Sequence, residues 1–432
     1  YENYKQFYYV QMKFFRNTYI LQGDSGDLNL YKLFLERGLN LVTGKKCLLI
    51  PGQITVDKGN TQLREYLLDN QMVYEIIGLT NKNNLFPGID NNQKFTLLFI
   101  DREKRHKKIK IFGWISKFKD FSGTHLIEIS NQTYKEFDKY FTFYLDTEKK
   151  NIETFEKIMN LPFIRRIEEL SFHYWREYDA TNDSNYFDDK EGKYLLFSGK
   201  AIDQYDCMAK IWIEKHGRSA KWKSFPFPKD YKNYRTEYYV DEMPDRIRQH
   251  HQREKSNYRI VIQNVSGAVN NIRTIYACLL HKIHLTNNSL HNIYLGTSDK
   301  ELLFYLAVLN SFVLDWQARM KVATNLNKFI IDTLLVPSFS EMEEELRNNI
   351  VKLSLQLSAI SPDFDALIRN VLGGRSYEEV GIMQEKERQK VKNKIDAMVA
   401  HLYHLTYEEL EAILNAFPLA TNEIKEEILK EF

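Results

Sequence analysis

The sequence predicts an α/β region, then an α+β region, then a helical end. The first 120 residues alternate short apolar runs with segments of helical periodicity. Residues from about 150 to 340 are rich in Tyr, Asn and Trp and have weak periodicity, and the remainder carries helix caps and a long apolar stripe. With 432 residues and roughly 100–200 residues per domain, several domains are expected. We therefore predict domains at 1–150, 151–340 and 341–432.

In the first region, apolar residues at helical spacing predict helices at 29–41 and 63–68. Short apolar runs, the first of which ends in Pro51-Gly52, predict strands at 47–50, 72–79, 95–100 and 109–115. Strands separated by helices indicate a layer of parallel strands. The last two strands lie too close in sequence for a crossover helix, so an antiparallel hairpin is expected there.

The helical end shows two sequences typical of a capping box, in which a hydroxyl and a carboxylate satisfy the first amide groups of a helix. They begin at Ser340 and at Thr406, each followed three residues later by Glu. An apolar stripe at helical spacing is formed by Val391, Ile395, Met398, Leu402 and Leu405. These patterns predict several packed helices after residue 340.

The composition excludes a disordered or collagen-like chain, since 43% of the residues are hydrophobic and 27% are charged. Lys and Arg number 60 against 58 Asp and Glu, which leaves a net charge of only +2. The charge is unevenly distributed: residues 207–259 hold 13 basic and 7 acidic side chains, and residues 341–432 hold 11 and 18. A polyanion is therefore expected at the middle region, although ordinary solvated faces would give the same counts.

The three cysteines, Cys47, Cys207 and Cys278, match no zinc or redox spacing, and their small number is typical of a reducing cytoplasm. The histidines lack the paired spacing of a metal site, so no metal is expected. No apolar run approaches the roughly 20 residues of a membrane span, and we expect a cytoplasmic protein. Because the first residue is Tyr1 rather than Met, a chain cut from a longer one is expected.

The α/β region suggests a nucleotide-type ligand at the carboxyl ends of its strands. No glycine-rich cradle or phosphate loop occurs, because the glycines from Gly23 to Gly59 are dispersed. The segment 85–95 joins the second and third predicted strands and contains Phe86-Pro87-Gly88. An aromatic ring in such a loop can stack on a planar substrate, or it can pack against its own domain, and the sequence leaves both readings open.

A family pattern becomes apparent from several collinear motifs. In the first region they are Gly26–Leu39, Leu48–Pro51, Phe86-Pro87 and Lys94-Phe95. Further along they are Arg176–Ser184, Phe197–Ile202, Gln204–Asp206, Asn271–Thr274, Leu309–Trp316, Thr324–Ile330, Leu335–Pro337, Ala400–Thr406 and Phe417-Pro418. Their order and spacing resemble the second half of gamma-class adenine-N6 DNA methyltransferases of the single-chain, type IIG-like type II restriction–modification family.

The resemblance implies the distal half of a Rossmann-like methyltransferase sheet, a DNA target-recognition domain and a helical tail. One departure is large: none of the nine prolines adjoins another or follows Asn, so the catalytic Asn-Pro-Pro-aromatic motif is absent. The glycine motif for S-adenosylmethionine is also absent. In the family both precede the segment matched by Tyr1. We therefore expect the carboxyl-terminal portion of a longer enzyme, or one half of a split enzyme, that is inactive alone.

By resemblance, Phe86 stacks on an adenine that has been swung out of the duplex, and Lys94 lies near the base or backbone. Asn29 and Tyr31 match the motif behind the cofactor and base pocket, while a helix N-cap Asn and a core Tyr are equally good readings. The expected cofactor of the complete enzyme is S-adenosylmethionine. The expected partners are double-stranded DNA and the amino-terminal half of the methyltransferase, in the same longer chain or in a separate subunit.

Direct readout of bases uses Arg or Lys for guanine and Asn or Gln for adenine. Candidate DNA-contacting residues in the recognition region are Arg176, Asn182, Asp183, Lys200, Gln204, Arg259, Asn270, Arg273, Asn325 and Asn327. Two alternatives stay open: a non-catalytic DNA-specificity subunit that recruits a separate catalytic chain, and the non-nuclease end of a bifunctional restriction enzyme.

Overall fold

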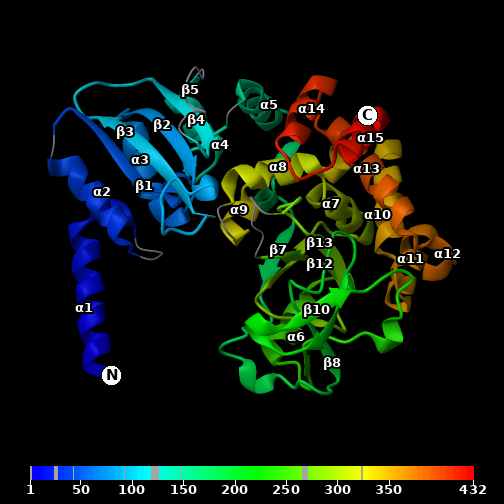
Figure 1. Ribbon diagram of the computed structural model, residues 1–432. Helices are drawn as coiled ribbons and strands as arrows, with labels where there is room; N and C mark the ends of the chain where they lie inside the picture. The colour runs from blue at the N-terminus through cyan, green and yellow to red at the C-terminus, as the bar shows by residue number, and fades with distance from the viewer. Residues whose placement is uncertain are drawn as a thin grey trace. The chain divides into compact units, whose positions relative to one another are not determined.

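A computed structural model describes residues 2–23, 28–41, 43–91, 93–117, 126–146, 148–264, 271–322 and 325–432. The chain divides into two compact units, Tyr1–Met159 and Asn160–Phe432 (Figure 1). The described residues include no helix that is both long enough and apolar enough to cross a membrane.

The first unit contains a five-stranded sheet with helices before and between its strands. Its helices are α1 Glu2–Thr18, α2 Leu30–Leu41, α3 Thr61–Asp69, α4 Asn131–Phe137 and α5 Lys149–Met159. Its strands are β1 Lys45–Pro51, β2 Val73–Thr80, β3 Lys94–Asp101, β4 Lys108–Ile115 and β5 Ile127–Ser130. Both predicted helices and all four predicted strands are present. The sequence patterns did not reveal α1, which exposes aromatic side chains along its length.

The strand order of this sheet is β1-β3-β2-β4-β5. Strand β3 is antiparallel to both β1 and β2, β4 is parallel to β2, and β5 is antiparallel to β4. Strands β1, β2 and β4 therefore run in one direction and end at one edge of the sheet. The sheet is thus mixed, and β1 and β2 share a direction without being neighbours.

The predicted hairpin between β3 and β4 is wrong, because β2 lies between these two strands. Their connection passes the start of β2, where the backbone N–H of His106 donates to the carbonyl of Gln71 over 2.8 Å. Strand β3 instead pairs with β2, from Val73 opposite Ile100 to Thr80 opposite Lys94.

Helix α3 packs an apolar face into the core of the first unit. Leu63 and Leu67, one helical turn apart, are fully buried, and each contributes about 1.5–3 kcal/mol to stability by leaving water. Between them Arg64 is also fully buried, and its guanidinium donates to the carbonyls of Ile54, Asp57 and Tyr140. Burial lowers the pKa of Arg64 to about 10. The chain that follows β1 is therefore fastened to α3.

The second unit combines small sheets with many helices. Its strands are β6 Ile164–Arg166, β7 Phe172–Trp175, β8 Tyr194–Phe197, β9 Lys210–Glu214, β10 Lys221–Ser224, β11 Tyr238–Val240, β12 Tyr258–Gln263, β13 Ala277–His281, β14 Leu285–Thr286, β15 Leu290–Leu295 and β16 Leu335–Pro337. Its helices are α6 Asp245–Arg253, α7 Asp299–Leu309, α8 Phe312–Lys321, α9 Lys328–Asp332, α10 Glu344–Ser358, α11 Asp365–Leu372, α12 Tyr377–Val380, α13 Glu385–Leu402, α14 Tyr407–Asn415 and α15 Asn422–Glu431.

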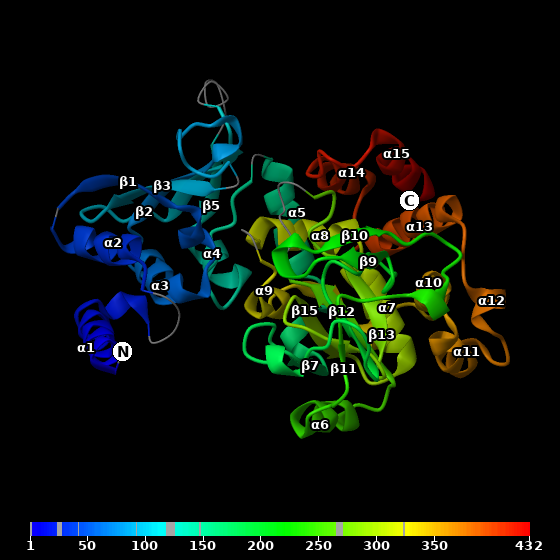
Figure 2. The same ribbon diagram turned by 60° about the horizontal axis from the view of Figure 1, so that its bottom comes forward.

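The largest sheet of this unit has the order β13-β12-β15-β7, and a smaller one has the order β11-β8-β14. Helix α7 packs against the larger sheet and also against α10 and α13 (Figure 2). The central strand β12 is buried along almost its whole length, because it has a neighbour on each side and a helix over one face.

The sequence predicted a separate helical segment at 341–432. In the structure these helices belong to the same compact unit as the residues from Asn160 onward. Asp396 in α13 accepts from the backbone N–H of Phe312 over 2.7 Å, and the hydroxyl of Tyr403 donates to the carbonyl of Leu335 over 2.7 Å. These bonds join α13 to α8 and β16 across many residues of sequence. The recognition segment and the last helices therefore share one core.

One of the two predicted capping boxes is confirmed. Thr406 accepts from the N–H of Glu409, whose carboxylate accepts from the N–H of Thr406, at the start of α14. The box predicted at Ser340 is wrong, because α10 begins only at Glu344. The hydroxyl of Ser340 shares a hydrogen bond with the hydroxyl of Ser338 instead.

Candidate functional site

The strands of the first unit present a row of apolar residues where β1, β2 and β4 end. Pro51 lies opposite Phe95, Phe95 opposite Leu79, and Leu79 opposite Ile115. The segment 81–93 leaves the sheet at this row and returns to it. Ligands of open α/β sheets bind beyond the carboxyl ends of parallel strands, so this edge is the candidate site of the first unit.

Asn81 holds the loop that carries Phe86. Its side chain is buried, and its Nδ2 donates to the carbonyls of Ile89 (2.9 Å) and Phe86 (3.2 Å). Its Oδ1 accepts from the N–H of Phe86 over 2.8 Å. These bonds from a short amide side chain to nearby backbone groups take the place of the backbone hydrogen bonds that a neighbouring strand would provide. The backbone of Phe86 is thereby fixed relative to the end of β2.

The ring of Phe86 is half-buried at this edge. It packs on a cluster formed by Ile77, Leu79, Phe112 and Ile115, and its centroid lies 4.6 Å from that of Phe95 at an interplanar angle of 57°. The core therefore supports the ring and leaves part of it exposed. A stacking role for Phe86 stays a prediction, since the same contacts also serve packing.

Lys94 stands at the same edge, at the first position of β3. Its Nζ lies 4.6 Å from the ring centroid of Trp114, which is at the end of β4. Two glycines make room for this pair: a Cβ at Gly52 would lie 2.8 Å from the Cβ of Lys94, and a Cβ at Gly78 would lie 2.7 Å from the ring of Trp114. The cation and the indole are thus placed by close backbone approach.

Trp114 was absent from the sequence predictions of the site. The only local sign is a large aromatic residue at the end of a predicted strand, which is ordinary for a half-buried strand. Its proximity to Lys94 depends on the pairing of β2 with both β3 and β4. Such long-range pairing leaves no mark in the neighbouring sequence.

Asn29 and Tyr31 lie at the beginning of α2. Asn29 is exposed and directly precedes the helix, and its carbonyl accepts from the N–H of Lys32 over 3.0 Å. The hydroxyl of Tyr31 accepts from Nδ2 of Asn60 over 3.1 Å, and that Nδ2 also donates to the carbonyl of Gln53. Burial raises the pKa of Tyr31 to about 12. Both residues have structural roles here, and a cofactor contact stays a prediction.

Several predicted DNA-contacting residues of the second unit lie on its surface. Arg176, Asn182, Lys200 and Asn325 are exposed, and Asp183 and Asn327 are half-buried. Nε of Arg176 donates to the hydroxyl of Tyr174 over 3.1 Å. A carboxylate oxygen of Asp183 forms an ion pair with Arg246 at 2.9 Å, so this side chain is partly engaged. Asn270 lies outside the described residues.

Three predicted DNA-contacting residues are in the interior, which corrects their assignment. Arg259 is fully buried, Arg273 is 6% exposed, and Gln204 is 6% exposed. Nε2 of Gln204 donates to the carbonyl of Asn310 over 3.0 Å, and the guanidinium of Arg273 donates to that same carbonyl over 2.7 Å. The guanidinium of Arg273 also lies 3.4 Å from the ring centroid of Phe312. These donors hold the core together and do not face a duplex.

Arg259 belongs to a buried polar network centred on Glu177. One carboxylate oxygen of Glu177 lies 3.0 Å from Nη2 of Arg259, and it accepts from the N–H of Thr286 over 2.7 Å. The other oxygen lies 2.6 Å from Nε2 of His251. Burial alone would raise the pKa of Glu177, but Arg259 and His251 outweigh it and hold the pKa below its ordinary value. The network joins β12, α6 and β14.

No family model and no curated protein matches this sequence. Solved structures similar to the chain include that of the type IIG restriction endonuclease BpuSI, with 13% identity, a TM-score of 0.34 and coverage of 95% of this chain and 50% of that one. They also include the type IIL restriction–modification enzyme MmeI in complex with DNA, with 13% identity, a TM-score of 0.43 and coverage of 94% and 53%. The chain spans about half the length of either structure.

Proposed function

We propose that the chain is part of a site-specific adenine-N6 DNA methyltransferase of a restriction–modification system. In this proposal the first unit supplies the base-stacking loop and the second unit binds duplex DNA. The observation that carries it is the position of Phe86, which a buried Asn81 fastens at the edge where β1, β2 and β4 end. The choice of this family in the proposal is based on the collinear sequence motifs.

The chemistry of adenine methylation explains what such a ring does. The exocyclic nitrogen is inaccessible within a duplex, so the base must leave the stack at a cost of a few kcal/mol. Stacking on an aromatic side chain contributes about 1–3 kcal/mol per base and offsets much of that cost. Phe86 is suited to this because Phe95 and the cluster beneath it keep the ring in place before the base arrives.

Lys94 has a positioning role in this proposal. Its Nζ lies over the face of Trp114 at the same edge, which keeps the cation close to the Phe86 loop. An ammonium there attracts the phosphate that flanks a displaced nucleotide. Lys94 would thus hold the backbone while Phe86 holds the base.

The methyl donor of the complete enzyme would be S-adenosylmethionine, which supplies the transferred methyl group. The residues present do not build its cradle: the described glycines near α2 and β1 are dispersed, and the hydroxyl of Tyr31 is already bonded to Asn60. The proposed partner is a polypeptide with the glycine and Asn-Pro-Pro-aromatic motifs, in the same longer chain or in a separate subunit.

A second candidate is a DNA-specificity module that recruits a separate catalytic chain. The observation in its favour is that no Asn-Pro-Pro motif occurs anywhere in the 432 residues. The two candidates differ in what Phe86 does, because a specificity module needs no base-stacking ring.

The test has two parts. Titration calorimetry of the chain with S-adenosylmethionine is expected to give no measurable heat of binding, and binding to duplex DNA is expected to weaken as salt rises. The chain is then assembled with a methyltransferase segment carrying the two missing motifs, and N6-methyladenine is quantified in the DNA. Duplex binding without any methylation in the assembled enzyme would favour the specificity module. Absence of both duplex binding and adenine methylation in the assembled enzyme would overturn the proposal.

A further inference from the structure

The second unit contains a cavity of about 750 Å³. Its walls are formed by residues that follow β8, by the first residue of β11 and by the last residue of β12, which bring together Ser198, Lys200, Tyr238 and Gln263. Ligand pockets in proteins are typically about 300–1,000 Å³ and combine apolar walls with a few polar groups. The cavity has that size and that mixture.

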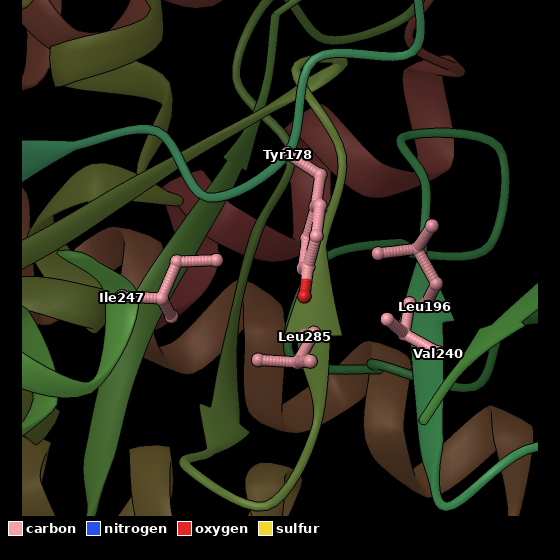
Figure 3. Close-up of a cluster of buried hydrophobic side chains, with 5 residues drawn as sticks. All are labelled: Tyr178, Leu196, Val240, Ile247 and Leu285. Atoms are coloured by element: carbon pink, nitrogen blue, oxygen red, sulfur yellow. The ribbon is translucent and has the colours of Figure 1, made fainter. Parts of the chain in front are cut away.

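Two aromatic rings line the cavity and pack on a buried hydrophobic cluster. Phe187 and Tyr238, whose ring centroids lie 5.4 Å apart, pack on a buried cluster formed by Tyr178, Leu196, Val240, Ile247 and Leu285. Figure 3 shows these five side chains, with Tyr178 pointing toward Leu285. Every member of the cluster is at most 2% exposed. The ring of Tyr238 also packs against that of His216, with the centroids 5.0 Å apart, so both cavity rings are held in place before a planar group arrives.

Two polar side chains in the wall have no hydrogen-bond partner among the described residues. Ser198 is only 7% exposed, and its Oγ has no partner within the described part of the chain. Gln263 is half-buried, and its side-chain amide forms no hydrogen bond to any residue that the structure describes. A buried polar group without a partner costs about 1–3 kcal/mol, which a ligand that bonds to it recovers. A hydroxyl and an amide are the groups that recognise the edge of a nucleobase.

Two cationic side chains, Lys200 and Arg218, also line the cavity. Nζ of Lys200 donates to the carbonyl of Gly217 over 3.0 Å, and the next residue, Arg218, is exposed and forms no ion pair with a described residue. The carboxylate of Glu237 is engaged by the N–H of Gly217. Lys200 and Arg218 therefore offer two positive charges to a phosphate.

The geometry points to a binding site for one unpaired nucleotide, with its base on Phe187 and Tyr238, its base edge at Ser198 and Gln263, and its phosphate at Lys200 and Arg218. The nucleotide could be an extrahelical nucleotide of bound DNA, and in that case the inference rests on the proposed function. A free mononucleotide has the same chemistry. The cavity belongs to the second unit, and the Phe86 loop belongs to the first.

The experiment compares three probes by fluorescence anisotropy with the whole chain. They are a fully paired 20-mer duplex, the same duplex with one central unpaired adenosine, and unlabelled deoxyadenosine monophosphate as competitor. The bulged duplex is expected to bind about tenfold more tightly than the paired one, as stacking of one base predicts. Gln263→Leu and Arg218→Met are each expected to reduce that preference about threefold to tenfold. Since Arg218 is exposed, its substitution leaves the fold intact.

Matched controls are Gln252→Leu in α6 and Lys223→Met in β10, both of which alter exposed side chains outside the cavity. They are expected to keep the full preference. In a second outcome, both duplexes bind equally, the mononucleotide competes, and Gln263→Leu and Arg218→Met abolish this competition. That result would assign the site to free nucleotides. Salt-dependent binding of both duplexes with equal affinity and no competition would overturn this inference alone. No binding of any probe would overturn the proposed function as well.

Discussion

Glu177 and Arg259 form an ion pair of 3.0 Å in which both side chains have no exposed surface. Burying two charges is costly, and removing one partner leaves the other uncompensated in the interior. The pair is stabilised further because Asn292 accepts from Nε of Arg259 over 2.7 Å and Thr286 donates to the carboxylate. A residue that looks suited to reading guanine therefore holds the core of the second unit.

Arg259→Met is expected to lower the free energy of unfolding of the second unit by about 3–5 kcal/mol, because the buried carboxylate of Glu177 would lose its guanidinium partner. Urea unfolding followed by circular dichroism measures the change. The control is Lys221→Met, which removes an ion pair with Glu214 whose side chains are about half exposed. That surface pair is expected to contribute less than about 1 kcal/mol. Equal losses in both variants would contradict the role given to Arg259.

Acid is expected to weaken the second unit through Glu177. Its pKa in the folded protein is lower than the ordinary value of 4.5, since Arg259 and His251 outweigh the effect of burial. A lowered folded pKa means that the stabilisation is complete above pH 4.5 and is lost as pH falls through the folded value. Unfolding free energies measured from pH 7 to pH 3 should therefore fall more steeply for the wild type than for Glu177→Gln. Parallel curves would contradict this assignment.

Much of the fold followed from local patterns. Apolar spacing located α2, α3 and the first four strands, and the Thr406–Glu409 capping box located the start of α14, because each depends on residues within one or two turns. The order of the strands did not follow. Placing β3 between β1 and β2 depends on long-range pairing, which neighbouring residues do not encode.

The candidate site was predictable only in part. Phe86 lies in the loop between β2 and β3, as the sequence predicted, and Lys94 is the first residue of β3. Arg259 and Arg273 were predicted to contact DNA because arginine is a residue that reads guanine. Their partners, Glu177 and Asp396, are 82 and 123 residues away, so the sequence near each arginine gives no indication of burial.

Arg176→Ala is expected to weaken duplex binding by the second unit uniformly across DNA sequences. The side chain is exposed and donates to the hydroxyl of Tyr174, and an exposed arginine is a common phosphate contact. Loss of one phosphate contact lowers the slope of log affinity against log salt by about 1. Filter binding at several salt concentrations measures the slope. Arg375→Ala, an exposed arginine in the acidic helical end, is the control and should leave the slope unchanged.

Asn81→Ala is expected to release the loop of Phe86 without removing the ring. The substitution leaves the N–H of Phe86 and the carbonyl of Ile89 without the side-chain bonds of 2.8 and 2.9 Å. In the assembled enzyme, methylation should fall about tenfold while the duplex affinity stays within about twofold, since roughly 1.4 kcal/mol of positioning is lost. Hydrogen exchange of the 84–90 amides reports the release directly. Unchanged exchange together with unchanged methylation would contradict the role of Asn81.

Phe86→Ala tests the stacking role itself. If the ring holds a displaced adenine, its loss removes about 1–3 kcal/mol that is realised only when the base has left the duplex, so the assembled enzyme should methylate about 10- to 100-fold more slowly. Affinity for the paired duplex should change little, and Phe86→Trp should restore most of the rate. Phe34→Ala removes an exposed ring from α2 of the same unit and should change neither quantity. An equal loss of methylation and DNA binding in Phe86→Ala, with a lower melting temperature, would show that the ring only packs against Phe95.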